Sequence, residues 1–132
     1  MSLVIAIDVG IKNLGLCVFD FATNTVVYWD NVTLVPSGRY LPANNVQYVR
    51  QFINKYEYFF ANAFAVLIER QMRANMRIIE SLLHHSTYEK CHIINARSVK
   101  MHYGLRTRNY RGNNAKAVEW ALGFCAANPT AF

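Results

Sequence analysis

Two acidic residues each follow an apolar run: Asp8 ends the stretch VIAID and Glu69 ends the stretch VLIE. If these runs form neighbouring parallel strands, both carboxylates emerge at one edge of the sheet, where open α/β folds build their sites. Two carboxylates about 4 Å apart repel by roughly 4 kcal/mol at an effective dielectric near 20, so a cation between them is expected. Hard oxygen ligands suit Mg²⁺, with Mn²⁺ as a substitute. The spacing favours a metal site, while the alternative is that Asp8 caps its own turn and Glu69 pairs with Arg70.

The elements that must position these acids follow from the apolar periodicity and the turn residues. Residues 3–9, 15–21 and 25–33 predict three strands in a meander, with a tight turn at Asn24. Further along, the pattern predicts a helix over 45–62, a strand over 64–71, a helix over 74–87, a strand over 91–96 and a last helix from Asn113 or Asn114 to Asn128. The order βββαβαβα indicates an α/β fold with a five-stranded mixed sheet flanked by helices, in one domain spanning 1–132.

The net charge of +6 is confined to one half of the chain. Residues 1–65 hold four bases and four acids, whereas residues 66–132 hold ten bases and four acids. A one-sided positive field favours a polyanionic partner such as nucleic acid, and a solvated basic face is the alternative.

Cysteine spacing and hydropathy bear on the compartment. Cys17, Cys91 and Cys125 are odd in number, far apart and set among apolar neighbours, so we expect free core thiols in a reducing, intracellular compartment. No apolar run approaches the roughly 18 residues that span a bilayer, and no membrane partner is expected. Trp29 and Trp120 are expected in the core, and the alternative is that they are platforms for a ligand.

Two longer stretches carry a family resemblance. IAIDVGIKNLGLCVFD and VLIERQMRANMRIIE, together with the later RNYRGNNAKAVEWA, resemble the RuvC-type Holliday junction resolvases. The resemblance is to the branch with the poxvirus and yeast mitochondrial enzymes, and most of all to its poxvirus members. It implies a ribonuclease H-like fold, a homodimer, a cytoplasmic location, and two-metal hydrolysis of DNA at four-way junctions and other branched DNA. In that family Asp8 and Glu69 match the metal ligands of the first and fourth strands.

The C-terminal end departs from the family pattern. The family supplies further acids, usually an aspartate pair, from its final helix, but no acid follows Glu119 here, and Glu119 lies too early to take that role. We therefore expect a final helix that lacks its C-terminal end, with catalysis impaired. The alternative is a junction-binding module of the same fold without catalysis. An actin-like ATP-binding domain would need a second phosphate motif and a longer chain.

The remaining assignments concern DNA and a partner subunit. The predicted DNA-binding residues are the bases along the charged half and the turn after the first strand: Lys12, Asn13, Arg70, Arg73, Arg77, Arg106, Arg108, Arg111 and Lys116. Lys12 and Asn13 alternatively only close their turn, and the arginines of residues 106–111 alternatively form a solvated loop. The resemblance assigns the stripe Met76, Ile79 and Leu83 to a dimer interface; the alternative is a helix that packs on its own sheet.

Overall fold

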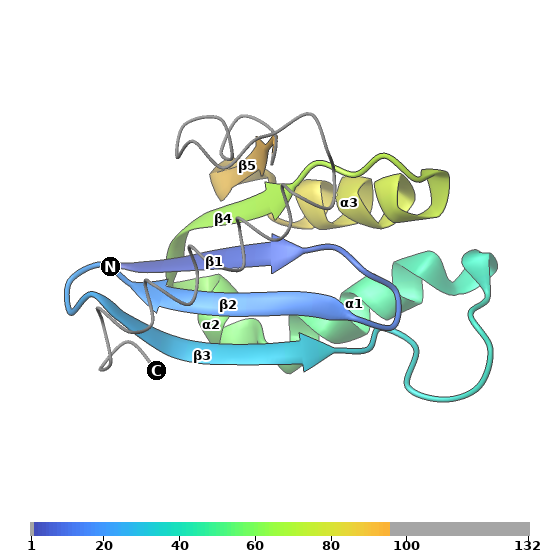
Figure 1. Ribbon diagram of the computed structural model, residues 1–132, viewed down its shortest axis with the longest axis horizontal. Coiled ribbons are helices and arrows are strands. Elements are labelled where there is room, and N and C mark those ends of the chain that lie inside the picture. The colour runs from blue at the N-terminus through green and yellow to red at the C-terminus, as the bar shows by residue number, and fades with distance from the viewer. Residues whose placement is uncertain (1, 96–132) are drawn as a thin grey trace, which may run out of the picture.

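The computed structural model describes residues 2–95, which form one mixed sheet with helices packed against it (Figure 1). The strands are β1 (Leu3–Asp8), β2 (Leu14–Asp20), β3 (Thr25–Val32), β4 (Ala63–Glu69) and β5 (Cys91–Ile94). Their order in the sheet is β3-β2-β1-β4-β5. This is the five-stranded mixed sheet that the sequence predicts, whereas the expected last helix lies outside the described residues.

Strand β1 lies at the centre of the sheet and sets its mixed character. It pairs antiparallel with β2 and parallel with β4, and β4 pairs parallel with β5. The predicted meander of the first three strands is confirmed, because β2 also pairs antiparallel with β3. Asn24 in the connecting turn has a φ of 55°, a left-handed conformation that asparagine tolerates better than most side chains.

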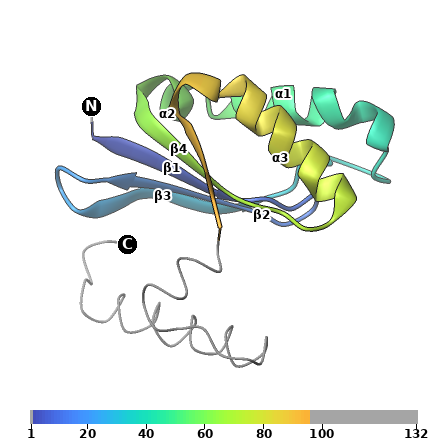
Figure 2. The ribbon, with the colours of Figure 1, turned by 90° about the horizontal axis from the view of Figure 1, so that it is seen from above.

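All helices of residues 2–95 cover the same face of the sheet (Figure 2). They are α1 (Asn45–Lys55), α2 (Glu57–Asn62) and α3 (Ala74–Ser86), with the 3₁₀ turns η1 (Pro42–Asn44) and η2 (Tyr88–Lys90). The single helix expected over 45–62 is wrong, because Tyr56 leaves the helical conformation with φ −110° and ψ 27°. Its buried ring packs against Phe52 and Tyr28, with ring centroids 5.3 and 5.7 Å away.

Within residues 2–95, no helix has both the length and the apolar character that crossing a membrane would require.

The core lies between the sheet and the helices, on the side that we call the helix face. Every second residue of the central strands points into it, and the fully buried strand side chains are Ile5, Leu14, Leu16, Val18, Val66 and Ile68. Burying an aliphatic side chain of this size contributes about 1.5–3 kcal/mol, so this layer fixes the strands in place.

Helix α3 contributes to the same core, which corrects the predicted dimer interface. Ile79 and Leu83 have 0% of their surface exposed, and Met76 is partly buried against the core. A second subunit that docks on the folded chain cannot reach Ile79 or Leu83, so their assignment to an interface is wrong. The alternative, an amphipathic helix that packs on its own sheet, describes these two residues.

Candidate functional site

The two acids at the strand ends lie side by side in the sheet. Strands β1 and β4 pair in parallel up to Ile7 and Ile68, and Asp8 and Glu69 are the next residue of each strand. Because hydrogen-bonded strands lie about 4.8 Å apart, this register brings the two acids to neighbouring positions. The expected meeting of both residues at one edge of the sheet is confirmed.

Both carboxylates also point to the same side of the sheet. Ile7 and Ile68, one position earlier, are buried on the helix face, and successive side chains alternate between faces. Asp8 and Glu69 therefore belong to the opposite face, which carries no helix from residues 2–95 and which we call the acid face. Asp8 is exposed and Glu69 is half-buried, so water and a phosphate group can reach this edge.

The chain that follows Glu69 is held by contacts from two neighbouring elements. The Gln71 side-chain amide donates to the Glu69 carbonyl oxygen at 2.9 Å, and the Gln71 backbone N–H donates to Glu80 Oε1 of α3 at 2.7 Å. On the other side, the backbone N–H of Arg70 donates to the carbonyl oxygen of Ile94 at the end of β5, at 2.8 Å. These bonds fix the backbone on which the Glu69 carboxylate is mounted.

The turn after Asp8 is equally constrained. A Cβ on Gly10 would lie 2.2 Å from the carbonyl oxygen of Asn13, so only glycine permits this close approach of the backbone. The carbonyl of Ile11 accepts the backbone N–H of Leu34 at 2.8 Å, which ties the turn to the segment after β3. Lys12 and Asn13 are held at the same sheet edge as the acids, with both side chains exposed.

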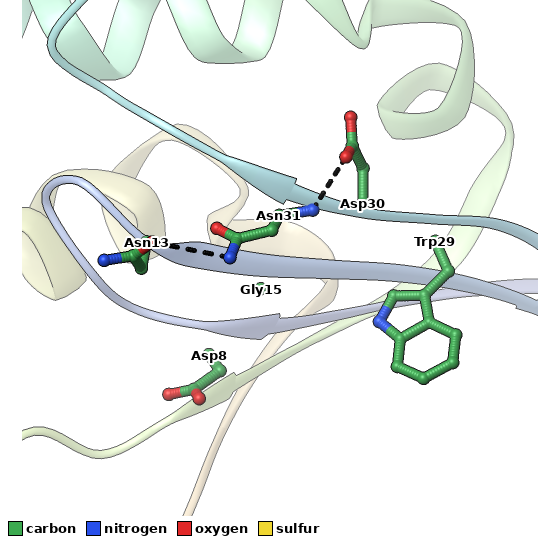
Figure 3. Close-up of a pocket in the computed structure, with 6 residues that line it drawn as sticks. All are labelled: Asp8, Asn13, Gly15, Trp29, Asp30 and Asn31. Atoms are coloured by element: carbon green, nitrogen blue, oxygen red, sulfur yellow. Dashed lines mark hydrogen bonds between the residues drawn. The ribbon is translucent and has the colours of Figure 1, made fainter.

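A hollow of about 490 Å³ lies beside Asp8 on this part of the sheet (Figure 3). Its lining residues are Asp8, Asn13, Gly15, Trp29, Asp30 and Asn31. Gly15 is the partner of Asp8 across β1 and β2, and Asn31 is the partner of Gly15 across β2 and β3. Because Gly15 has no side chain, the space between the Asp8 carboxylate and the Asn31 amide stays open.

Trp29 corrects an expectation from the sequence. It was expected in the core, but 64% of its surface is exposed. It pairs with Cys17 across β2 and β3, and its indole points away from the sheet on the same side as Asp8, whereas Asp30 points the opposite way (Figure 3). Trp120, the other tryptophan, lies outside the described residues.

Four of the basic residues that the structure describes lie near the same edge. Lys12 follows β1, Arg70 directly follows β4, and Arg73 and Arg77 lie at the start of α3. All four side chains are exposed. The other predicted DNA-binding residues, Arg106, Arg108, Arg111 and Lys116, lie outside the described residues.

The donor set at the strand ends fits a hard divalent cation. Two carboxylates from adjacent strands reach an accessible edge, and oxygen donors of this kind bind Mg²⁺ together with water and substrate phosphate. Within residues 2–95 no cluster of three or more acidic, histidine or cysteine side chains could hold a metal ion. Asp8 and Glu69 are thus a partial ligand set, and their role as catalytic metal ligands stays a prediction.

Several residues around the acids were missed by reasoning from the sequence: Gly15, Trp29, Asn31, Gln71 and Glu80. The period of two in a strand places Trp29 and Asn31 on one face, and that signal was available. The contact between Gln71 and Glu80 joins a loop to a helix nine residues away, and nothing in the local pattern marks it.

Comparisons with known proteins identify the fold. No protein-family model matches the chain, and no curated protein matches it. Among solved structures, the fowlpox virus Holliday junction resolvase matches with a TM-score of 0.60 and 18% identity over 89% of this chain and 72% of that one. The fowlpox virus resolvase in complex with substrate Holliday junction DNA matches with a TM-score of 0.65 and 14% identity, over 95% and 76%.

A bacterial structure gives the same answer. Thermus thermophilus RuvC in complex with a Holliday junction substrate matches with a TM-score of 0.52 and 16% identity, over 99% of this chain and 98% of that one. The chain therefore has the fold of RuvC-type resolvases, and the fold that the sequence resemblance implied is confirmed.

Proposed function

We propose that this chain is a structure-specific DNA endonuclease that resolves Holliday junctions and other branched DNA by hydrolysing phosphodiester bonds. The observation that carries the proposal is the register of β1 and β4, which makes Asp8 and Glu69 neighbours on the accessible acid face. The same fold occurs in a fowlpox virus resolvase and in Thermus RuvC, both of which have been solved with Holliday junction DNA.

The catalytic roles follow from the positions of the acids. Asp8 and Glu69 would hold Mg²⁺, or Mn²⁺ in its place, through carboxylate oxygens on two rigid strands. The chemistry that such ions would supply there is that of two-metal hydrolysis: activation of the attacking water and stabilisation of the leaving oxygen. Lys12 and Asn13, in the constrained turn beside Asp8, would orient the phosphate. Mounting the ligands on strands limits their movement more than a loop would.

The proposed DNA surface extends from the acids along the start of α3. Arg70, Arg73 and Arg77 are exposed there and would neutralise phosphates of the junction arms, with the arginines of residues 106–111 and Lys116 as further candidates. Because phosphate contacts release counterions, we expect junction affinity to fall steeply as salt rises.

We also propose a homodimer, because symmetric cleavage of a junction needs two sites related by a twofold axis. Ile79 and Leu83 are not available for it. The exposed side of α3 includes Ile78, with 47% of its surface exposed, and Met72 precedes the helix with 90% exposed. Analytical ultracentrifugation of the chain with Ile78→Asp should then give a monomer, whereas an unchanged dimer would exclude this surface.

The decisive experiment compares junction cleavage and junction binding in matched variants. With Mg²⁺ or Mn²⁺ we expect the native chain to nick a four-way junction, while Asp8→Asn and Glu69→Gln lower the cleavage rate at least about 100-fold, beyond the typical loss for an outer-shell partner. Glu57→Gln, an exposed acid on α2, is the control and should cut normally. Cleavage that survives Asp8→Asn, or equal affinity for branched and linear duplex at matched salt, would contradict the proposal.

The second candidate is a junction-binding module without catalysis. It is favoured by the two-carboxylate ligand set, since residues 2–95 hold no cluster of three or more side chains that could bind a metal ion. The same gel assay separates the two functions: tight and branch-selective binding without nicks, at any Mg²⁺ or Mn²⁺ concentration, would identify the module.

A further inference from the structure

An exposed aromatic ring and an amide lie on the same face of the sheet as Asp8, and the proposed cleavage chemistry does not use them. Trp29 and Asn31 are two positions apart on β3 and both line the hollow beside Asp8. Asn31 Nδ2 donates to Asn13 Oδ1 over 3.4 Å, a long hydrogen bond that a ligand could replace. The hollow therefore offers one flat apolar surface and two side-chain amides.

The side chains of β3 alternate between the core and solvent, and Trp29 belongs to the solvent side. Tyr28 and Val32 of β3 contact the core, while Trp29 has 64% of its surface in solvent. Exposed aromatic residues that serve as stacking platforms recur where proteins bind single-stranded nucleic acid, because every base has a π-face. Asparagine beside such a platform can donate to and accept from the edge of a base.

The distance between this surface and the acids suits neighbouring nucleotides of one strand. Asn31 and Asp8 are two strands apart through Gly15, and Trp29 lies two residues farther along β3. With about 4.8 Å between strands and about 3.4 Å per residue, the Cα atoms of Trp29 and Asp8 are about 12 Å apart across the sheet. The indole side chain extends from the same side of the sheet as the carboxylate (Figure 3).

We propose that Trp29, Asn31 and the gap over Gly15 form a subsite for an unpaired nucleobase of the strand that Asp8 and Glu69 cleave. The base stacks on the indole of Trp29. The Asn31 amide gives up its hydrogen bond to Asn13 and contacts the edge of the base. This inference rests on the proposed function, and it specifies that function: the substrate would be DNA with unpaired nucleotides beside the scissile phosphate, as at a branch point.

Binding measured without metal tests the subsite separately from cleavage. The probes are a single-stranded oligothymidylate and a fully paired duplex of equal length. We expect Trp29→Ala to weaken oligothymidylate binding about 5- to 150-fold, the range for the loss of one base stack, and to leave duplex binding unchanged. Trp29→Phe should keep part of the affinity. Tyr58→Ala removes an aromatic residue of 71% exposure from α2 and should change neither affinity.

Tryptophan fluorescence gives a second and direct reading. The chain has two tryptophans, so Trp120→Phe leaves Trp29 as the only one. We expect oligothymidylate to quench its emission more strongly than duplex does. Equal quenching by the two probes, or an unchanged oligothymidylate affinity in Trp29→Ala, would overturn the subsite.

The outcomes distinguish this inference from the proposed function. If the native chain does not cleave junctions but binds oligothymidylate more tightly than Trp29→Ala does, the nuclease is rejected and the base subsite is kept. Normal junction cleavage by Trp29→Ala, together with unchanged oligothymidylate binding, would reject the subsite and keep the nuclease.

Discussion

The two faces of the central strand differ in what they contribute. On the helix face Ile5 and Ile7 are fully or almost fully buried under the helices, while on the acid face Ala6 and Asp8 are exposed. The same six residues therefore provide both the anchor and the reactive group. A carboxylate that must hold a cation gains precision from this arrangement, because its immediate neighbour in the chain is locked in the core.

Substitutions at adjacent positions of β1 should show the largest difference in stability between the two faces. Ile7→Ala leaves a cavity in the core and should lower the free energy of unfolding by about 2–5 kcal/mol. Asp8→Asn should leave the metal-free value unchanged or raise it by up to about 1 kcal/mol, because a charge beside Glu69 is removed. Urea denaturation of both variants measures the difference. If Asp8→Asn destabilises the chain as much as Ile7→Ala does, Asp8 is a structural residue.

Glu80 links the two faces, since it reaches from α3 to the loop that follows Glu69. Glu80→Ala removes the acceptor of the Gln71 N–H and should cost about 1.5–3 kcal/mol, the value for a hydrogen bond to a charged group. Glu80→Gln keeps an oxygen acceptor and should cost less. Thermal unfolding measures the loss of stability. In a Mg²⁺ titration of junction cleavage, Glu80→Ala should need a higher Mg²⁺ concentration for half-maximal activity. The exposed Glu89 is the control, and a similar loss in Glu89→Ala would remove the special role of Glu80.

The glycines on either side of the turn after β1 should respond differently. A Cβ on Gly10 clashes with the Asn13 carbonyl oxygen, so Gly10→Ala should destabilise the chain by about 1–3 kcal/mol, as overpacking does. A Cβ on Gly15 would lie 3.4 Å from the Asp8 Cβ, an ordinary contact, so Gly15→Ala should be neutral or slightly stabilising. Chemical denaturation of both variants checks this contrast, which equal losses would contradict.

The titration of the Cys17 thiol should have the smallest effect on stability. This residue lies on the acid face between Ala6 and Trp29, is free and half-buried, and burial raises the pKa of its thiol above the ordinary value of 9.0. The folded chain then keeps a proton that the unfolded chain has lost. The associated stability is fully present below the ordinary pKa and is lost as the pH rises through the raised pKa.

Iodoacetamide alkylation measures this shift. With Cys91 and Cys125 replaced by serine, half-maximal reactivity of Cys17 should occur at higher pH in the folded chain than in urea. Identical profiles in the two states would show that the acid face does not desolvate this thiol.

Much of the fold and the acid pair could be predicted because the signals are local. The apolar runs that end in Asp8 and Glu69 define β1 and β4, and Asn24 marks the hairpin turn. The parallel pairing of these strands was the condition on which the acid pair depended, and the register of β1 and β4 meets it. The support of the acids could not be predicted in the same way, because Gln71 and Glu80 act through a contact between separate elements.

The sequence by itself determined which residues alternate on each strand and each helix, since periods of 2 and 3.6 follow from backbone geometry. Only the tertiary structure decided what covers each set. An apolar stripe on α3 has the same sequence pattern whether it packs on its own sheet or on a second subunit. The complete burial of Ile79 and Leu83 shows that they pack in the core of their own chain. For Trp29 the helices of residues 2–95 cover the other face, so this aromatic residue, which was expected in the core, is exposed on the same face as Asp8.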